Sequence, residues 1–212
     1  MDNFQREDDY FSLCGLNSSL RPLYIRKSCS GCLQGSPCAV QCEFVPCSIE
    51  HGNLSYCFEC GEYPCPKYDG VDQYDSLITH KNQLKDMQKA KAIGIEKYRE
   101  EQIAKSRLLH ELLNEYDNGR RDVFFFLAVN LFELNDSQQI LDKANELTKD
   151  MNLDEKSDYI KSMFLHLAFK KNISLKLRKA DGNSYITFFK MLNINFANIF
   201  LKILSFTFGE KS

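Results

Sequence analysis

The sequence has no excess of either charge, because its 212 residues include 27 lysines and arginines and 29 aspartates and glutamates. This balance removes the bulk attraction on which proteins that bind nucleic acid or anionic membranes rely. HExxH, GxSxG, GxGxxG and Walker sequences are all missing, so we identify no small-molecule substrate and expect a protein that is not an enzyme. The chain opens with acidic and polar residues rather than a basic and apolar secretory signal, and we therefore expect a cytoplasmic protein.

Cysteine is absent after position 65, although the first third of the chain holds nine. In a reducing cytosol, so dense a set is typical of metal ligands or redox groups rather than of disulfides. The odd number agrees, since pairing would leave one thiol over. Residues 1–66 carry 4 basic and 8 acidic residues, a net charge of −4, and this acidity argues against nucleic acid as the partner.

Residues 1–68 are predicted to form a cysteine-rich module without much regular structure, of which residues 1–13 form a loose leader. From Cys14 to Pro66, glycine or proline occurs every few residues, and no helical or strand period is apparent. Such a segment buries too little apolar surface to fold alone. Bound metal supplies folding free energy directly, so we expect one or two metal ions to hold the module together.

Two C-x2-C pairs, Cys29/Cys32 and Cys57/Cys60, give the strongest indication of metal, because a knuckle of this spacing lets two sulfurs reach one ion. Four thiolates close a tetrahedral zinc site and leave no open position, so such a zinc ion is structural. The pairing we favour joins these two pairs in one site and four other thiols in a second. The predicted ligands are Cys29, Cys32, Cys38, Cys42, Cys47, Cys57, Cys60 and Cys65, with Cys14 as a spare or replacement ligand.

Other uses of these thiols remain open. An iron–sulfur cluster also takes four thiolates, and Cys65 is followed by proline as in ferredoxins, although the ferredoxin spacings are missing. His51 could replace one thiol of a zinc site, but eight thiols already suffice and we expect a loop histidine. A third alternative is a metal or thiol sensor in which Cys14 stays reactive.

The order of these motifs carries a resemblance. Cys14-Gly15-Leu16, then SGC at 30–32 and CFECGEYPCPKY at 57–68, resembles an uncharacterised family of cysteine-rich bacterial and archaeal proteins, a domain of unknown function with a CGLxCxxCP start and a CxxCxxxPC close. GRRDVFFFLAVNLFEL and NISLKLRK are similar to a helical part that some members carry, which extends the resemblance over residues 11–179. It implies metal binding and no known activity. Ser18 and Arg21 stand where the family start has cysteines, which implies that any cluster built on that start is incomplete or absent here.

Residues 69–212 are predicted to form a helical domain. The stretch 77–119 has helical periodicity, with a break at Gly94 and a stop at Asn118-Gly119. DVFFFLAVNLFEL is apolar on every side, which predicts a buried central helix. Two further helices are expected, one with Asp136 as N-cap in a capping box with Gln139, and one that begins near Asp154.

The end of the chain has two further patterns. ISLKLRK alternates with period two and ADGN supplies a turn, which predicts a small β-hairpin over 173–189. Residues 190–208 are amphipathic and too polar for a transmembrane span, so they form either a helix that covers the core or one that contacts a membrane or a partner. The sequence thus predicts a mainly α protein whose zinc-binding, cysteine-rich module presents a surface to another protein.

Overall fold

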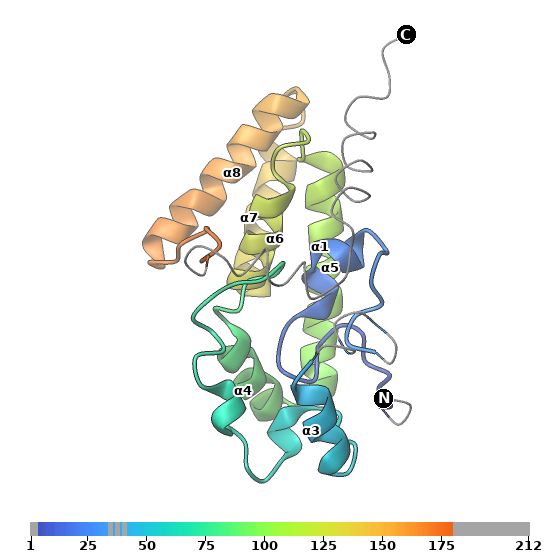
Figure 1. Ribbon diagram of the computed structural model, residues 1–212. Coiled ribbons are helices and arrows are strands. Elements are labelled where there is room, and N and C mark those ends of the chain that lie inside the picture. Colours follow the sequence, from blue (N-terminus) through green and yellow to red (C-terminus); the bar gives the residue numbers. More distant parts are fainter. Residues whose placement is uncertain (1–3, 34–35, 37–38, 40–41, 180–212) are drawn as a thin grey trace. The chain divides into compact units, whose positions relative to one another are not determined.

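The computed structural model describes residues 4–33, 36, 39 and 42–179, and the regular elements of this part are helices (Figure 1). No strand occurs among these residues, so the predicted mainly α class is confirmed. Short elements lie in the cysteine-rich part and long ones follow it. The elements are η1 (Ser18–Leu20), α1 (Pro22–Ile25), α3 (Phe44–Glu50), η2 (Cys57–Glu59), η3 (Pro66–Tyr68), α4 (Gln83–Ile93), α5 (Ile95–Glu115), α6 (Asp122–Leu131), α7 (Leu134–Leu147) and α8 (Leu153–Lys170).

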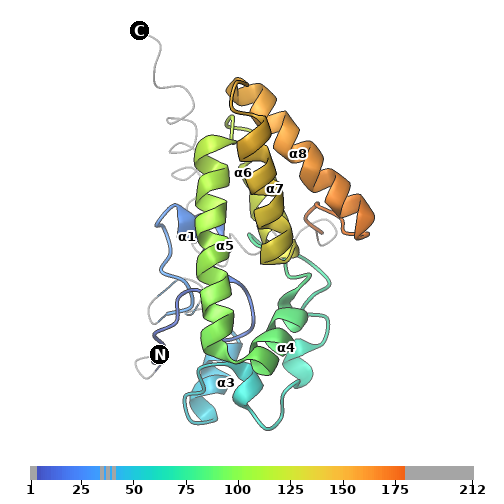
Figure 2. The ribbon, with the colours of Figure 1, turned by 180° about the vertical axis from the view of Figure 1, so that it is seen from behind.

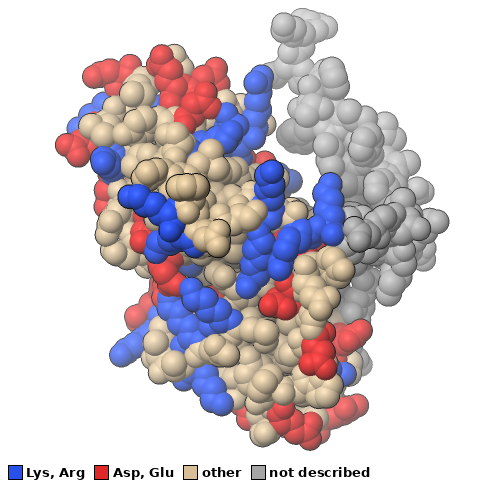
Figure 3. Space-filling view, turned by 90° about the vertical axis from the view of Figure 1, so that its left-hand side faces the viewer, with Lys and Arg blue, Asp and Glu red and all other residues tan. Residues whose placement is uncertain are grey.

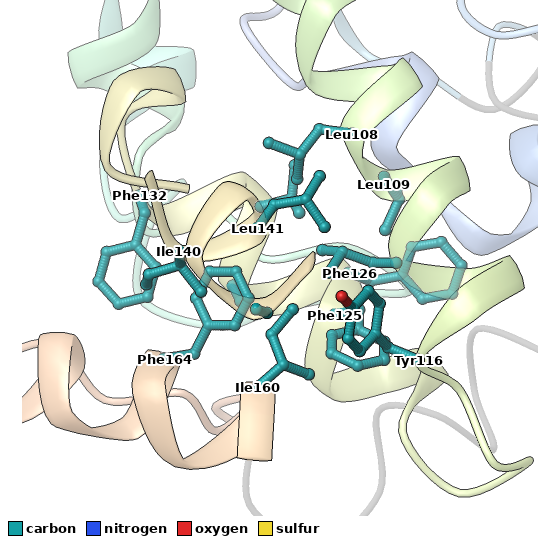
Figure 4. Close-up of a cluster of buried hydrophobic side chains, with 14 of the residues drawn as sticks. Leu108, Leu109, Tyr116, Phe125, Phe126, Phe132, Ile140, Leu141, Ile160 and Phe164 are labelled. Atoms are coloured by element: carbon teal, nitrogen blue, oxygen red, sulfur yellow. The ribbon is translucent and has the colours of Figure 1, made fainter. Parts of the chain in front are cut away.

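Helix α6 is the centre of the long helices. Every residue from Phe125 to Leu131 is buried, because α5 and α7 pack directly against this helix. Helix α8 completes the enclosure, since the ring of Phe164 stacks on that of Phe132 with 6.0 Å between centroids. Figure 4 shows Phe125 beside Tyr116 of α5, with Ile160 and Phe164 reaching the same cluster. A helix with no solvent face needs no polar side, and the predicted central helix is confirmed.

Helices α4 and α5 meet at Gly94, as predicted. Gly94 has a φ of +89°, which glycine adopts without the steric cost that a Cβ would add. Helix α5 then runs from the cysteine-rich part to the helices α6 and α7 (Figure 2). One continuous helix therefore contributes to both parts of the molecule.

The predicted helix ends are partly right. Helix α8 begins next to Asp154, with Asn152 and Glu155 forming a reciprocal capping box. The predicted N-cap at Asp136 is wrong, because α7 already begins at Leu134, with the extended Glu133 at the N-cap position. Asp136 instead lies in the first turn and accepts a hydrogen bond from Lys171 Nζ at 2.7 Å.

Both ends of the helical stretch predicted over 77–119 differ from the helix ends in the structure. The predicted helix over 77–119 is shorter in the structure, since α4 begins only at Gln83 and α5 ends at Glu115. Asp117 then accepts hydrogen bonds from the backbone N–H groups of Gly119, Arg120 and Arg121. The turn at Asn118-Gly119 therefore separates α5 from α6, three residues later than the end of the helix itself.

The β-hairpin predicted over 173–189 is not supported. Residues 173–179 form no strand, and residues 180–189, like the amphipathic stretch 190–208, lie outside the described residues. The alternation has another cause: Ile173 and Leu175 pack on the helical core. Lys81 Nζ donates to the carbonyl oxygens of Ser174 and Lys176 at 2.6 and 2.8 Å. Period two here indicates an extended segment held on a core by side chains rather than a paired strand.

Buried polar contacts join the cysteine-rich part to α4 and α5. Asn17 Nδ2 donates to Asp86 Oδ2 at 2.9 Å, and Tyr98 Oη donates to Asn17 Oδ1 at 3.0 Å. Burial raises the pKa of Asp86 to about 6, although the nearby ammonium of the buried Lys105 acts to lower it. The described chain as far as Arg178 accordingly forms one compact unit. The predicted division into residues 1–68 and 69–212 stays a prediction.

Among the residues that the structure describes, no helix combines the length and the apolar character needed to cross a membrane.

Candidate metal centre

The residues before the first cysteine are part of the module rather than a loose leader, contrary to the prediction. Phe4, Phe11 and Leu13 are fully buried. Arg6 donates to three carbonyl oxygens, those of Ser55 at 2.8 Å and Cys32 at 3.0 Å in distant segments and that of the nearby Phe11 at 2.8 Å. Arg6 thereby fixes the backbone of the first C-x2-C pair against the segment that precedes the second. No sequence pattern around Arg6 predicts this role, since its three carbonyl partners follow no regular spacing.

Asp8 adds a second connection of the same kind. Its carboxylate is buried and accepts a hydrogen bond from Tyr56 Oη at 2.5 Å. The other oxygen accepts from the backbone N–H groups of Tyr10 and Phe11. These bonds place the residue immediately before Cys57 next to the start of the chain.

The Cys14-Gly15-Leu16 loop packs closely on α4. Gly15 has a φ of +95°, and a Cβ built there would lie 2.3 Å from Met87 Cγ and 2.9 Å from Gln83 O. Only glycine allows this approach. The carbonyl oxygen of Cys14 accepts hydrogen bonds from Gln83 Nε2 at 2.9 Å and Tyr68 Oη at 3.2 Å. The position of Cys14 is thus set by α4 and η3.

Four predicted ligands line one pocket. This pocket is small, with a volume of about 20 Å³, and its wall includes Cys47, Cys57, Cys60 and Cys65 together with His51. Cys47 lies on α3, Cys57 and Cys60 lie at the two ends of the η2 turn, and Cys65 precedes η3. Aromatic and aliphatic side chains complete the wall, namely Leu13, Phe44, Leu54, Tyr63 and Tyr68.

The second C-x2-C pair has the geometry of a metal knuckle. The backbone N–H of Cys60 donates to the carbonyl of Cys57 at 3.1 Å and closes the turn. The N–H of Glu62 is directed at Cys60 Sγ, with 3.5 Å between nitrogen and sulfur. N–H groups that point at a sulfur stabilise its thiolate and orient it as a ligand.

His51 ends α3 in the same pocket. Its Nδ1 lies 2.8 Å from the carbonyl oxygen of Cys47, four residues earlier, and 3.7 Å from Cys47 Sγ. Its Nε2 lies 3.9 Å from Glu62 Oε1. The backbone contact of Nδ1 accounts for this side chain as a helix-end histidine.

A second group of thiols lies on the other side of Cys57. Cys14 and Cys32 are buried, and Cys32 packs in one apolar cluster with Cys42 and Cys57. Burial raises the pKa of the Cys14 thiol, and the neighbouring Cys42, Cys32 and Cys57 raise it further. Burial likewise raises the pKa of Cys57 to about 12, with contributions from Cys47, Cys42 and Cys65. Burial and the neighbouring thiols thus both favour the protonated forms of Cys14 and Cys57.

Cys29 is held differently from its predicted partner Cys32. Arg21 Nη2 donates to Cys29 Sγ at 3.7 Å, and this sulfur lies 3.8 Å from the carbonyl oxygen of Gly31. The pocket contains Cys57 and Cys60 but not Cys29 or Cys32. The pocket thus brings the second C-x2-C pair together with Cys47 and Cys65, and the favoured pairing of ligands stays a prediction. Cys38 lies outside the described residues.

The donor set fits the metals that the sequence suggests. Four thiols, with an imidazole beside them, are ligands that zinc takes in structural sites, and four thiolates also hold iron–sulfur clusters. Within residues 4–33, 36, 39 and 42–179, no three Cys, His, Asp or Glu side chains form a group that could hold a metal ion as they stand. Metal binding therefore requires the thiols around the pocket to turn inward.

Comparison with known families identifies the cysteine-rich part. Residues 6–70 match the model of a family described as "Protein of unknown function (DUF3795)". The match supports the predicted resemblance to an uncharacterised family for this segment, and it ends before α4, whereas the predicted resemblance extends to residue 179. Comparisons with curated proteins and with solved structures gave no significant match.

Proposed function

We propose that the cysteine-rich part is a non-catalytic zinc module of a cytoplasmic protein, and that it presents a surface to another protein. In this proposal Cys47, Cys57, Cys60 and Cys65 hold a structural zinc ion. The observation that carries it is the knuckle at Cys60: a C-x2-C turn with a backbone N–H directed at its sulfur, on the wall of a pocket that two further thiols line. Four thiolates leave no open coordination position, which agrees with the absence of catalytic motifs from the sequence.

The short helices of the module are the reason to expect that a bound metal ion stabilises its fold. Its helices are short, and its largest is the seven-residue α3 among the residues that the structure describes. Structural zinc contributes roughly 10–16 kcal/mol to the folding of zinc-finger peptides. The aromatic wall of Phe44, Tyr63 and Tyr68 excludes water from one side of the pocket, which protects thiolate–metal bonds from exchange.

The surface around the pocket indicates the kind of partner. Glu43, Glu50, Glu59 and Glu62 are all exposed there. In Figure 3 acidic side chains gather at the upper end and at the lower edge, the latter being the end at which Figure 1 places α3, while lysine and arginine side chains lie across the middle of the same face. We propose a protein partner with a basic surface, because opposite potentials steer association and suppress wrong partners.

Metal analysis after anaerobic purification tests the proposal. We expect colourless protein with one or two zinc ions per chain. Brown protein containing iron and acid-labile sulfide would replace the zinc module by an iron–sulfur protein, and protein without bound metal would refute both.

A pair of variants in the pocket tests the ligand assignment. Cys65→Ser removes one thiolate and should lower the zinc content by about one ion per chain, since a structural site needs all four ligands. His51→Ala is the matched control from the same pocket and should keep the wild-type zinc content. Loss of zinc in His51→Ala alone would show that the imidazole is the ligand in place of Cys65.

A further inference from the structure

Helices α7 and α8 form a groove outside the cysteine-rich part. The two helices diverge from the turn that connects them (Figures 1 and 2), and the groove that they line has a volume of about 680 Å³. Its floor is apolar, because Tyr159, Met163 and Leu167 of α8 are only partly buried where they pack on the helical core. Ile140 completes the floor from α7. The groove therefore leaves apolar side chains within reach of a ligand.

Exposed apolar side chains extend this surface along both helices. Leu147 lies four residues after Lys143, on the face of α7 that lines the groove, and it is 48% exposed. On α8, Leu165 and Phe169 each directly precede a residue of the groove wall, and they are 45% and 86% exposed. Neighbouring exposed apolar side chains of this size mark interaction sites rather than ordinary surface.

The charged side chains of the groove leave a positive balance. Asp136 is compensated by Lys171, whose Nζ lies 2.7 Å from its carboxylate. Among the described residues that line the groove, Asp136 has the only carboxylate. Lys143 on α7 and Lys170 on α8 form no ion pair with any residue that the structure describes. The groove therefore complements an acidic ligand.

The positions of these two lysines fit a helical ligand. The ion pair between Asp136 and Lys171 places the start of α7 beside the end of α8, so that Lys170 stands at this end of the groove. Lys143 follows Asp136 by seven residues, which is about 10 Å along a helix. Two acidic residues seven positions apart on a bound helix span the same distance, and the residues between them at i+3 and i+4 face the floor.

We propose that this groove binds an amphipathic helix of another protein, with acidic residues at i and i+7 and apolar residues at i+3 and i+4. This surface is distinct from the acidic one around the zinc module and takes a partner of the opposite charge. Binding here needs no metal, so failure of the proposal leaves the proposed zinc module unaffected. A bilayer would meet the exposed Phe169 but would not enter a groove between two helices.

Photo-cross-linking of the full-length protein tests the proposal. His166 on the groove wall is exposed and is replaced by p-benzoylphenylalanine, and the protein is irradiated in the cells that naturally produce it. Mass spectrometry of the adduct should identify a segment of another protein with the acidic and apolar spacing given above. An adduct with residues 180–212 of the same chain, with a second copy, with a lipid or with a segment of other composition would overturn the proposal, as would the absence of an adduct.

Charge-reversal variants then test the two lysines with a synthetic peptide of the cross-linked segment. Lys143→Glu combined with Lys170→Glu should raise the dissociation constant, measured by fluorescence anisotropy, about tenfold or more. Lys149→Glu combined with Lys161→Glu makes the same change in net charge outside the groove and should leave the constant within about twofold. Equal weakening in the two double variants would show a non-specific charge effect and contradict the assigned groove. Circular dichroism checks that both variants fold.

Discussion

The two parts of this molecule reach the same degree of burial by different means. In the long helices, backbone hydrogen bonds are local and apolar side chains meet at helical spacing, as Phe125, Ile160 and Phe164 do. In the cysteine-rich part, Phe11 and Leu13 are as fully buried, yet side chains satisfy part of the backbone there, as Arg6 does for the carbonyls of Phe11 and Ser55. A buried core therefore does not require regular structure when polar side chains satisfy the backbone.

The largest expected effect is on the helical core. Phe164→Ala removes a fully buried ring that stacks on Phe132, and it should lower the free energy of unfolding by about 3–5 kcal/mol. Urea denaturation followed by circular dichroism measures this loss. Phe169→Ala, on the same helix but 86% exposed, is the control and should change the free energy by less than about 0.5 kcal/mol. Equal losses in the two variants would contradict the assigned core.

This core is also the part that the sequence predicts best. The apolar run of α6, the break at Gly94 and the start of α8 all follow from local patterns, because a helix encodes its own burial at a fixed period. The hairpin failed for the opposite reason: Leu175 alternates like a strand residue, but the carbonyls on either side of it, those of Ser174 and Lys176, accept hydrogen bonds from the side chain of Lys81. A pattern of burial specifies the conformation of a segment but not what it pairs with.

In the cysteine-rich part, the sequence predicts which residues are candidate ligands but not which of them lie together. Residue types indicate candidate ligands directly, since thiols at C-x2-C spacing have few other uses in a reducing compartment. Their grouping depends on contacts across many residues, such as that of Arg6 with Ser55 or of Asp8 with Tyr56. No window of the sequence contains both ends of those contacts. No short-range pattern in the sequence could therefore test the favoured pairing of Cys29 with Cys57.

The next largest effect concerns the buried charge between the two parts. Lys105→Met removes the ammonium near Asp86, and at pH 8 it should lower the free energy of unfolding by about 3 kcal/mol, because a carboxylate is left buried without its counter-charge. The folded-state pKa of Asp86, about 6, lies above its ordinary value of 3.8. Stability that comes from its protonation is therefore present at low pH and lost as the pH rises through 6.

The sign of that pH dependence provides the measurement. The loss caused by Lys105→Met should be smaller at pH 5, where Asp86 is protonated, than at pH 8. Adding Asp86→Asn removes the charge at every pH, and the double variant should show a smaller and pH-independent loss. Urea denaturation at the two pH values measures the loss of unfolding free energy in each variant. The same loss at both pH values in Lys105→Met would show that the ammonium of Lys105 does not interact with the carboxylate of Asp86.

A smaller effect is expected where the Cys14-Gly15-Leu16 loop meets α4. Gly15→Ala adds a Cβ against Met87 and Gln83 at a positive φ, so it should lower the free energy of unfolding by about 2–3 kcal/mol. Gly52→Ala has a similar φ of +91° but no atom within 4 Å, and should lose only about 1 kcal/mol. Thermal denaturation of both variants separates the steric clash from backbone strain. Equal losses would mean that the loop does not press on α4.

The smallest predicted effect is confined to one helix. Asn152→Ala removes the side-chain acceptor for the Glu155 N–H and should lower the free energy of unfolding by about 1 kcal/mol. Asn118→Ala removes an exposed hydrogen bond to Asp154 at the same helix end and should change it by less than about 0.5 kcal/mol. Urea denaturation ranks the two. A larger loss in Asn118→Ala would contradict the capping box, and neither variant should alter metal content.

Helix α5 connects the cysteine-rich part directly with the helical core. Near its start, Tyr98 bonds to Asn17 of the cysteine-rich part, and near its end Leu109 and Leu112 enter the helical core. Unfolding of the first turns of α5 exposes the buried ring of Tyr98 and breaks its bond to Asn17. Were the proposed zinc ion removed, we would therefore expect the loss of stability in the cysteine-rich part to reach the helical core through α5.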